Sequence, residues 1–247
     1  MLGLFFFCLV IASWALQEKS PEFWLIYLTH WGIALCCVQT LFAAGLVTFR
    51  HYQIQKLESV PYHDKMPIAY KMYWGAQTCT VTVAFGISII YWTLLHSAEY
   101  STVMNFMTHG MNSILMLVDL FVISHPTKLL HFYLAICVSL IYAIFSVIYF
   151  WADGLDPHDN HFIYNILDWN NPGPAVIVVV GGLVLLIFLH ILVFLIYKFR
   201  LYLHARLNRN NTMVLPISTI SGRTNLAYTY DCEGDKSETK ESFDQKY

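Results

Sequence analysis

Six apolar segments separated by shorter polar stretches dominate the sequence. They cover residues 1–16, 23–48, 72–96, 105–124, 129–151 and 175–197. A helix needs about 20 apolar residues to span the roughly 30 Å hydrocarbon core of a bilayer, and its backbone groups must be paired within the segment. Five segments reach that length, and the first is short. We therefore predict an all-α polytopic membrane helix bundle over residues 1–198, with about six transmembrane helices.

The basic residues orient the predicted bundle. Of the 14 Lys and Arg residues, all except Lys19 lie in the gaps 49–71 and 125–128 or beyond the last apolar segment, from Lys198 onward. Because Lys and Arg are enriched in the cytoplasmic loops of membrane proteins, we predict that both termini are cytoplasmic and that 152–174 is an outer loop. The polar tail, residues 199–247, carries mixed charge and is predicted to be cytoplasmic and largely disordered.

Composition narrows the classes of function. Hydrophobic residues make up 57% of the chain and charged residues only 12%, whereas a soluble domain carries about 25% charged residues. The net charge of −2 leaves no basic surplus for binding nucleic acid. We predict no cofactor. We also predict no metal site, because the outer-loop pattern D-x-x-D-x-H-D-x-H over 153–161 lacks Cys ligands and a fixed helical spacing.

Several polar residues inside the apolar segments share one predicted depth. Thr29 lies about 9 Å into its segment from the outer side, and His109 and Asn112 lie about 6 and 10 Å into theirs. One such residue is typical of a hydrogen bond between packed helices. Five of them on three helices favour a polar pocket near the outer face, and these residues are Thr29, His30, His96, His109 and Asn112.

Asp119 is the sole charged residue inside a predicted span, which makes it a candidate functional residue. His190 has nearly the same predicted depth, about 22 Å against about 21 Å, so the two side chains are candidates for a pair across the bundle. A neutral, hydrogen-bonded Asp119 that locks helix packing is an equally good interpretation. We place His30, His96, Asp119 and His190 in a candidate binding pocket.

The sequence also bears on two further classes of ligand, haem and anionic lipid. A transmembrane haem protein needs paired axial histidines, and nothing in the spacing fixes such a pair among the span histidines, His30, His109, His131 and His190. Four basic residues follow the last apolar segment and are predicted to contact anionic lipid, at about 1 kcal/mol each; they are Lys198, Arg200, Arg206 and Arg209. Apart from the lipid bilayer, the sequence identifies no partner.

Four stretches cover nearly the whole membrane region in order, and they are FWLIYLTHWGIALC (23–36), THGMNSILMLVDLF (108–121), HPTKLLHFY (125–133) and YNILDWNNPGPA (164–175). Together they resemble the rolling stone family of insect multi-pass membrane proteins. The resemblance implies a plasma-membrane protein that acts in cell–cell fusion, because rolling stone proteins are associated with myoblast fusion.

The chain is more distantly similar to the androgen-induced membrane hydrolases, which cleave fatty acid esters of hydroxy fatty acids. That family's Leu-Thr nucleophile context matches Leu28-Thr29. Its Asn-His-Gly-Met-His motif matches residues 108–112, so Asn112 stands where the resemblance implies the catalytic His. The family's loop residues are retained as Tyr164, Leu167, Asp168, Pro172 and Gly173.

The presence of Asn112 in place of the catalytic His of the hydrolase motif distinguishes two candidate functions. A Thr hydroxyl needs a base, and Asn cannot accept its proton at neutral pH. The first interpretation is therefore a non-enzymatic protein of the rolling stone type that acts in fusion or adhesion. The alternative is a membrane threonine hydrolase of lipid esters, in which His109, one turn from Asn112, replaces the base. Asn112 or His30 would then stabilise the oxyanion.

Overall fold

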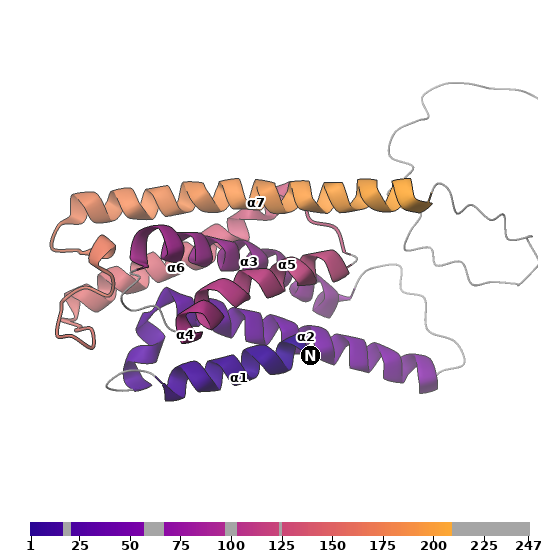
Figure 1. The fold of residues 1–247 in the computed structure, drawn as a ribbon, viewed down its shortest axis with the longest axis horizontal. Helices are drawn as coiled ribbons and strands as arrows, with labels where there is room; N and C mark the ends of the chain where they lie inside the picture. Colours follow the sequence, from indigo (N-terminus) through magenta and orange to yellow (C-terminus); the bar gives the residue numbers. More distant parts are fainter. Residues whose placement is uncertain (17–20, 57–66, 97–102, 124, 209–247) are drawn as a thin grey trace, which may run out of the picture. The chain divides into compact units, whose positions relative to one another are not determined.

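The structure, a computed structural model, describes residues 1–16, 21–56, 67–96, 103–123 and 125–208. Within these ranges all the regular elements are helical (Figure 1). The α-helices are α1 (Leu2–Ala15), α2 (Leu28–Lys56), α3 (Ile68–Ile90), α4 (Val103–Phe106), α5 (Asn112–Val122), α6 (Phe132–Trp151) and α7 (Pro172–Asn208). Two π-helical turns, η2 (Tyr91–Leu95) and η4 (Met107–Met111), follow α3 and α4. Short 3-10 turns are η1 (Pro21–Ile26), η5 (Leu129–His131) and η6 (Asn165–Leu167).

The helices support the predicted all-α membrane bundle. Four of them are long and apolar enough to cross a bilayer: α2, α3 with η2, η5 with α6, and α7. α1 is apolar but has only 14 residues. The remaining predicted span is helical from Val103 to Val122, but the π-turn η4 divides it. The predicted sidedness of the loops stays a prediction.

Residues 1–204 form one compact unit. Inside it α3 is the central helix, because it packs against α2, α5 and α6, while α1 packs against α2 (Figure 1). α7 reaches α3 at Gly86, where an added Cβ would lie 2.8 Å from Cδ2 of Leu186. Glycine at this position therefore permits the close approach of the two helices.

The surface of the compact unit is apolar where the helices face outward. Large side chains such as Ile177, Val184 and Phe188 of α7 are more than half exposed. The interior holds a core that includes Phe6, Ile33, Val81 and Met116. Such exposed apolar side chains suit contact with lipid rather than with water, which agrees with the predicted membrane bundle.

Arg200 of α7 has a structural role that the sequence did not predict. Its guanidinium donates to the carbonyl oxygen of Leu120 at 2.6 Å and to that of Ile123. These carbonyls lie at the C-terminal end of α5, where a cation also interacts favourably with the helix dipole. Arg200 therefore binds α5, and its predicted contact with anionic lipid stays a prediction. Of the other predicted lipid-binding residues, Arg209 lies outside the described residues.

Candidate functional site

Thr29 and His109 meet at the end of the bundle that we predict to be outer. Thr29 is the second residue of α2 and is 8% exposed. Its Oγ1 lies 3.5 Å from Nδ1 of His109, which belongs to η4. The structure thus brings together a hydroxyl and an imidazole from two different helices, as the depth argument anticipated.

The π-turns explain why His109 has this position. π-helical turns are rare and occur frequently at functional sites. His109 in one π-turn stacks on Tyr91 in the other, with ring centroids 3.4 Å apart and ring planes 1° apart. The carbonyl oxygen of His109 accepts a hydrogen bond from Ser88, whose Oγ lies 2.5 Å from Oγ of Ser113. Stacking and hydrogen bonding therefore fix the turn that carries the imidazole.

Asn112, which stands at the position of the motif His, is hydrogen-bonded to Cys36. Its Oδ1 accepts a hydrogen bond from the thiol of Cys36 at 3.0 Å. Cys36 lies seven residues after Thr29 on α2, about 10 Å along the helix. Asn112 is fully buried, and its Nδ2 has no hydrogen-bond partner among the described residues. The structure therefore pairs Asn112 with Cys36 and brings His109 into contact with the Thr29 hydroxyl.

Two tyrosines hold the backbone around Thr29. The phenolic oxygen of Tyr164 accepts a hydrogen bond from the backbone N–H of Leu28 at 3.0 Å. The hydroxyl of Tyr142 donates to the carbonyl oxygen of Ile26 at 2.8 Å. The first N–H groups of a helix lack partners within it, so Tyr164 supplies a cap from a loop 136 residues away in the chain. We call Thr29, His109 and Tyr164 the outer group.

His30 and His96 lie near His109 and interact with it electrostatically. The Nδ1 of His30 is 2.6 Å from the carbonyl oxygen of Trp24, whose ring stacks on the imidazole. His96 packs against Tyr91, and its Nδ1 has no partner among the described residues. Both histidines thus lie beside His109, but neither lines the apolar cavity between α3, α6 and α7.

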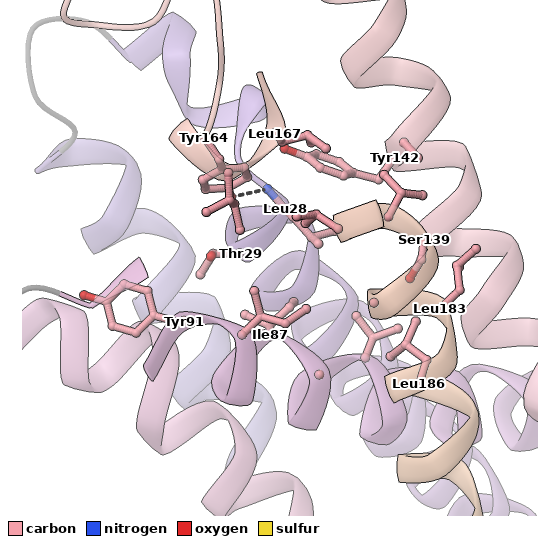
Figure 2. A pocket seen from close by; sticks show the side chains of 18 of the residues that line it. Leu28, Thr29, Ile87, Tyr91, Ser139, Tyr142, Tyr164, Leu167, Leu183 and Leu186 are labelled. Atoms are coloured by element: carbon pink, nitrogen blue, oxygen red, sulfur yellow. Dashed lines mark hydrogen bonds between the residues drawn. The ribbon is translucent and has the colours of Figure 1, made fainter. Parts of the chain in front are cut away.

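An apolar cavity of about 120 Å³ begins at Thr29 and extends between α3, α6 and α7 (Figure 2). Its polar lining consists of a few hydroxyl groups, those of Thr29, Tyr91, Ser139, Tyr142 and Tyr164, and the rest is aliphatic. An apolar cavity of roughly 150 Å³ holds a benzene molecule, so this one accommodates part of an apolar chain. The cavity places Thr29 beside a space for a ligand.

A second polar cluster lies deeper, which we call the inner group: Gln39 of α2, Gln77 of α3 and Asp119 of α5. All three are at least 92% buried, and the two amides interact with the Asp119 carboxyl group. Three of their polar atoms have no hydrogen-bond partner among the described residues: Oε1 of Gln39, Nε2 of Gln77 and Oδ2 of Asp119. None of the three residues lines the cavity.

The predicted pair of Asp119 with His190 is not formed. The two ring nitrogens of His190 lie 3.4 Å from Oγ1 of Thr82 and 3.1 Å from the carbonyl oxygen of Lys128. Asp119 is instead enclosed by the amides of the inner group. The prediction used depth alone, and depth leaves the direction around each helix undetermined.

The acidic outer loop is organised by its own hydrogen bonds. Oδ1 of Asp156 accepts from the backbone N–H groups of His158 and Asn160, both at 2.8 Å. Burial by itself would raise the pKa of Asp156, but the hydrogen bonds from Asn160 and His158 outweigh it and lower the pKa. Among the residues that the structure describes, no group of three or more potential ligands has metal-binding geometry.

The sequence singled out Thr29 and His109 and named Tyr164 only as part of the loop pattern, and it gave no role to Tyr91 or Ser88. The retained loop pattern, which begins at Tyr164, was the available signal for that residue. Nothing in the helical periodicity indicates Tyr91 or Ser88, because both support a π-turn that the apolar pattern does not reveal.

Comparisons with known proteins identify the family. A family model described as protein rolling stone matches residues 1–219. Protein rolling stone of Drosophila melanogaster is 31% identical over 207 residues, which cover 81% of this chain and 73% of the relative. No solved structure matches significantly. This chain belongs to the rolling stone family of multi-pass membrane proteins.

Proposed function

We propose that this protein is a membrane hydrolase in which Thr29 is the nucleophile, His109 is the general base and the substrate is an amphiphilic lipid ester. The contact of Thr29 with His109 carries the proposal, together with the cavity that Thr29 lines. Among the sequence interpretations the hydrolase was the alternative, because Asn112 stands at the motif position of the catalytic base. The proposal gives the role of base to His109, which contacts Thr29.

The chemistry follows from the two side chains. Thr29 Oγ1 attacks the ester carbonyl carbon while Nδ1 of His109 takes the hydroxyl proton. The tetrahedral intermediate collapses, the alkoxide leaves, and His109 returns the proton to it, which leaves an acyl-threonine. Water then attacks the acyl group and gives its proton to His109. Collapse releases the fatty acid, and the proton returns to Thr29.

The geometry is that of a site without substrate. The 3.5 Å separation is at the long end of a hydrogen bond, and catalytic hydrogen bonds often tighten only when substrate is bound. The stacked ring of Tyr91 restricts His109 to one plane, so a small shift of the hydroxyl is enough to shorten the contact.

The cavity favours a lipid substrate. Its aliphatic walls suit an acyl chain, and Thr29 and Tyr164 line it at the place where the ester would lie. An amphiphile with its chain in the bilayer and its ester toward the interface has this distribution of polarity.

The test is labelling of the purified protein by a fluorophosphonate activity probe in lipid nanodiscs. We expect wild type to be labelled, and Thr29→Ala and His109→Ala to lose labelling. Thr40→Ala is the matched control, because its hydroxyl is also on α2 but donates only to the carbonyls of Cys36 and Cys37. Equal labelling of wild type and Thr29→Ala would refute the proposal.

Family membership supports a second proposal, a role in cell–cell fusion, including myoblast fusion, at the plasma membrane. An epitope tag in the predicted outer loop should be stained on intact cells, and expression should increase content mixing between cells. Unchanged mixing with a stained surface tag would remove this role. Thr29→Ala in the same assay shows whether fusion requires the hydroxyl.

A further inference from the structure

Ester hydrolysis by Thr29 requires a hydrogen-bond donor for the oxyanion of the tetrahedral intermediate. The sequence suggested Asn112 or His30. Asn112 binds Cys36, and Nδ1 of His30 binds the carbonyl oxygen of Trp24. Neither residue lines the cavity in which the ester would lie. The donor must therefore be sought among the residues that border both Thr29 and the cavity.

The hydroxyl of Tyr164 meets both conditions. Tyr164 lines the cavity, where its phenol meets the backbone nitrogen of Leu28 (Figure 2). It also interacts with the backbone and the side chain of Thr29. Its oxygen accepts the N–H of Leu28 at 3.0 Å, so the oxygen is fixed while its own proton remains to be donated. The hydroxyls of Thr29 and Tyr142 lie near the phenol and interact with it.

The protonation state agrees with a donor. Burial raises the pKa of Tyr164 above its ordinary value of 10.0, and the hydrogen bonds from Leu28 and Thr29 offset this only in part. The phenol is therefore protonated at neutral pH. A hydroxyl that accepts a backbone N–H is also polarised by it, which strengthens the bond that it donates.

We propose that Tyr164 is the oxyanion donor of this site, and that its O–H, held by Leu28 N–H, donates to the ester carbonyl oxygen as Thr29 attacks. The inference rests on the proposed hydrolase function. It assigns a catalytic role to η6 and the outer loop, beside the helices that carry Thr29 and His109. No covalent bond to Tyr164 forms, and its proton stays on the phenol throughout.

The test measures hydrolysis of para-nitrophenyl decanoate by the full-length protein in nanodiscs. Tyr164→Phe should lower kcat by about 10²- to 10³-fold, the usual loss for one oxyanion donor, with a small change in KM. The matched control is Tyr149→Phe, because the Tyr149 hydroxyl donates to the Leu155 carbonyl oxygen away from the cavity. Tyr149→Phe should keep wild-type kcat.

Binding of the matched para-nitrophenyl decyl ether distinguishes hydrogen-bond donation by Tyr164 from a structural role of its side chain, because the ether has no carbonyl oxygen to accept the hydrogen bond. Tyr164→Phe should bind it as wild type does. Loss of ether binding in step with kcat would show a purely structural Tyr164 and overturn the inference. A wild-type kcat in Tyr164→Phe, with Thr29→Ala inactive, would overturn the inference and leave the hydrolase function standing. Wild type no more active than Thr29→Ala would overturn both.

Discussion

The outer group and the inner group are both polar clusters buried in a membrane bundle, but their surroundings differ. Thr29 and Tyr164 border an apolar cavity, and the groups that hold them are hydrogen-bonded. Gln39, Gln77 and Asp119 are enclosed by three helices and keep unpartnered polar atoms. Burial of polar residues therefore does not by itself mark a reactive site. The outer group is distinguished by a hydroxyl in contact with an imidazole, beside a cavity that Thr29 and Tyr164 line.

The largest contrast is expected between His109 and Asn112, which are three residues apart. His109→Ala should lower esterase activity by about 10²- to 10⁴-fold, the usual contribution of a general base. Asn112→Ala should retain activity and lower the melting temperature, because it leaves the Cys36 thiol without its acceptor. Loss of activity in Asn112→Ala with full activity in His109→Ala would reverse the assignment.

Filling the cavity should have the next largest effect. Gly182 lines the cavity, its neighbour Gly181 does not, and an added Cβ meets no atom within 4 Å at either position. We expect Gly182→Leu to lower kcat/KM for a long-chain ester by about tenfold, since pocket contacts of this size discriminate by such factors. Gly181→Leu should behave as wild type. An equal response of the two variants would show that the substrate chain lies elsewhere.

The inner group should affect stability rather than activity. Asp119→Leu removes the carboxyl group with which the buried amides of Gln39 and Gln77 interact, and the loss of such a buried polar partner costs about 1–3 kcal/mol. A detergent-stability assay should show this loss, with a smaller loss in Asp119→Asn. Because His190 binds elsewhere, the effects of Asp119→Leu and His190→Leu should add within about 0.5 kcal/mol. A larger coupling would contradict the observed separation.

The smallest effect concerns pH. Burial, and secondarily the charge of Arg200, lowers the pKa of His125 from 6.5 to about 4. Since this folded-state pKa is depressed, the unfolded chain binds the proton first, and stability falls as pH decreases from about 6.5 to 4. His125→Phe, which keeps an aromatic ring against Tyr73, should flatten the melting temperature over that range. An unchanged pH profile would contradict the expectation.

Much of this architecture could be predicted because it depends on local sequence. Apolar runs of sufficient length give the helices, and the rise per residue gives the common depth of Thr29 and His109. The π-turn at Met107–Met111 could not be predicted, because one wider turn does not alter an apolar run. It nevertheless decides that His109, and not Asn112, faces Thr29.

Contacts between segments that are far apart in the chain could not be predicted from the sequence either. Tyr164 reaches Leu28 across 136 positions, and Arg200 reaches the carbonyl of Leu120 across 80. Both side chains satisfy backbone groups at helix ends, and such partners depend on how the helices pack. The same limit explains the incorrect pairing of Asp119 with His190, because depth was known and rotation about the helix axis was not.

The most direct test of the central claim is mass spectrometry of the protein after brief incubation with para-nitrophenyl decanoate and acid quenching. The proposed mechanism predicts a decanoyl adduct on the peptide that contains Thr29. It should accumulate in wild type, be absent from Thr29→Ala, and be localised by fragmentation to the Thr29 hydroxyl. An adduct on another residue, or ester turnover by wild type that persists undiminished in Thr29→Ala, would contradict a threonine hydrolase.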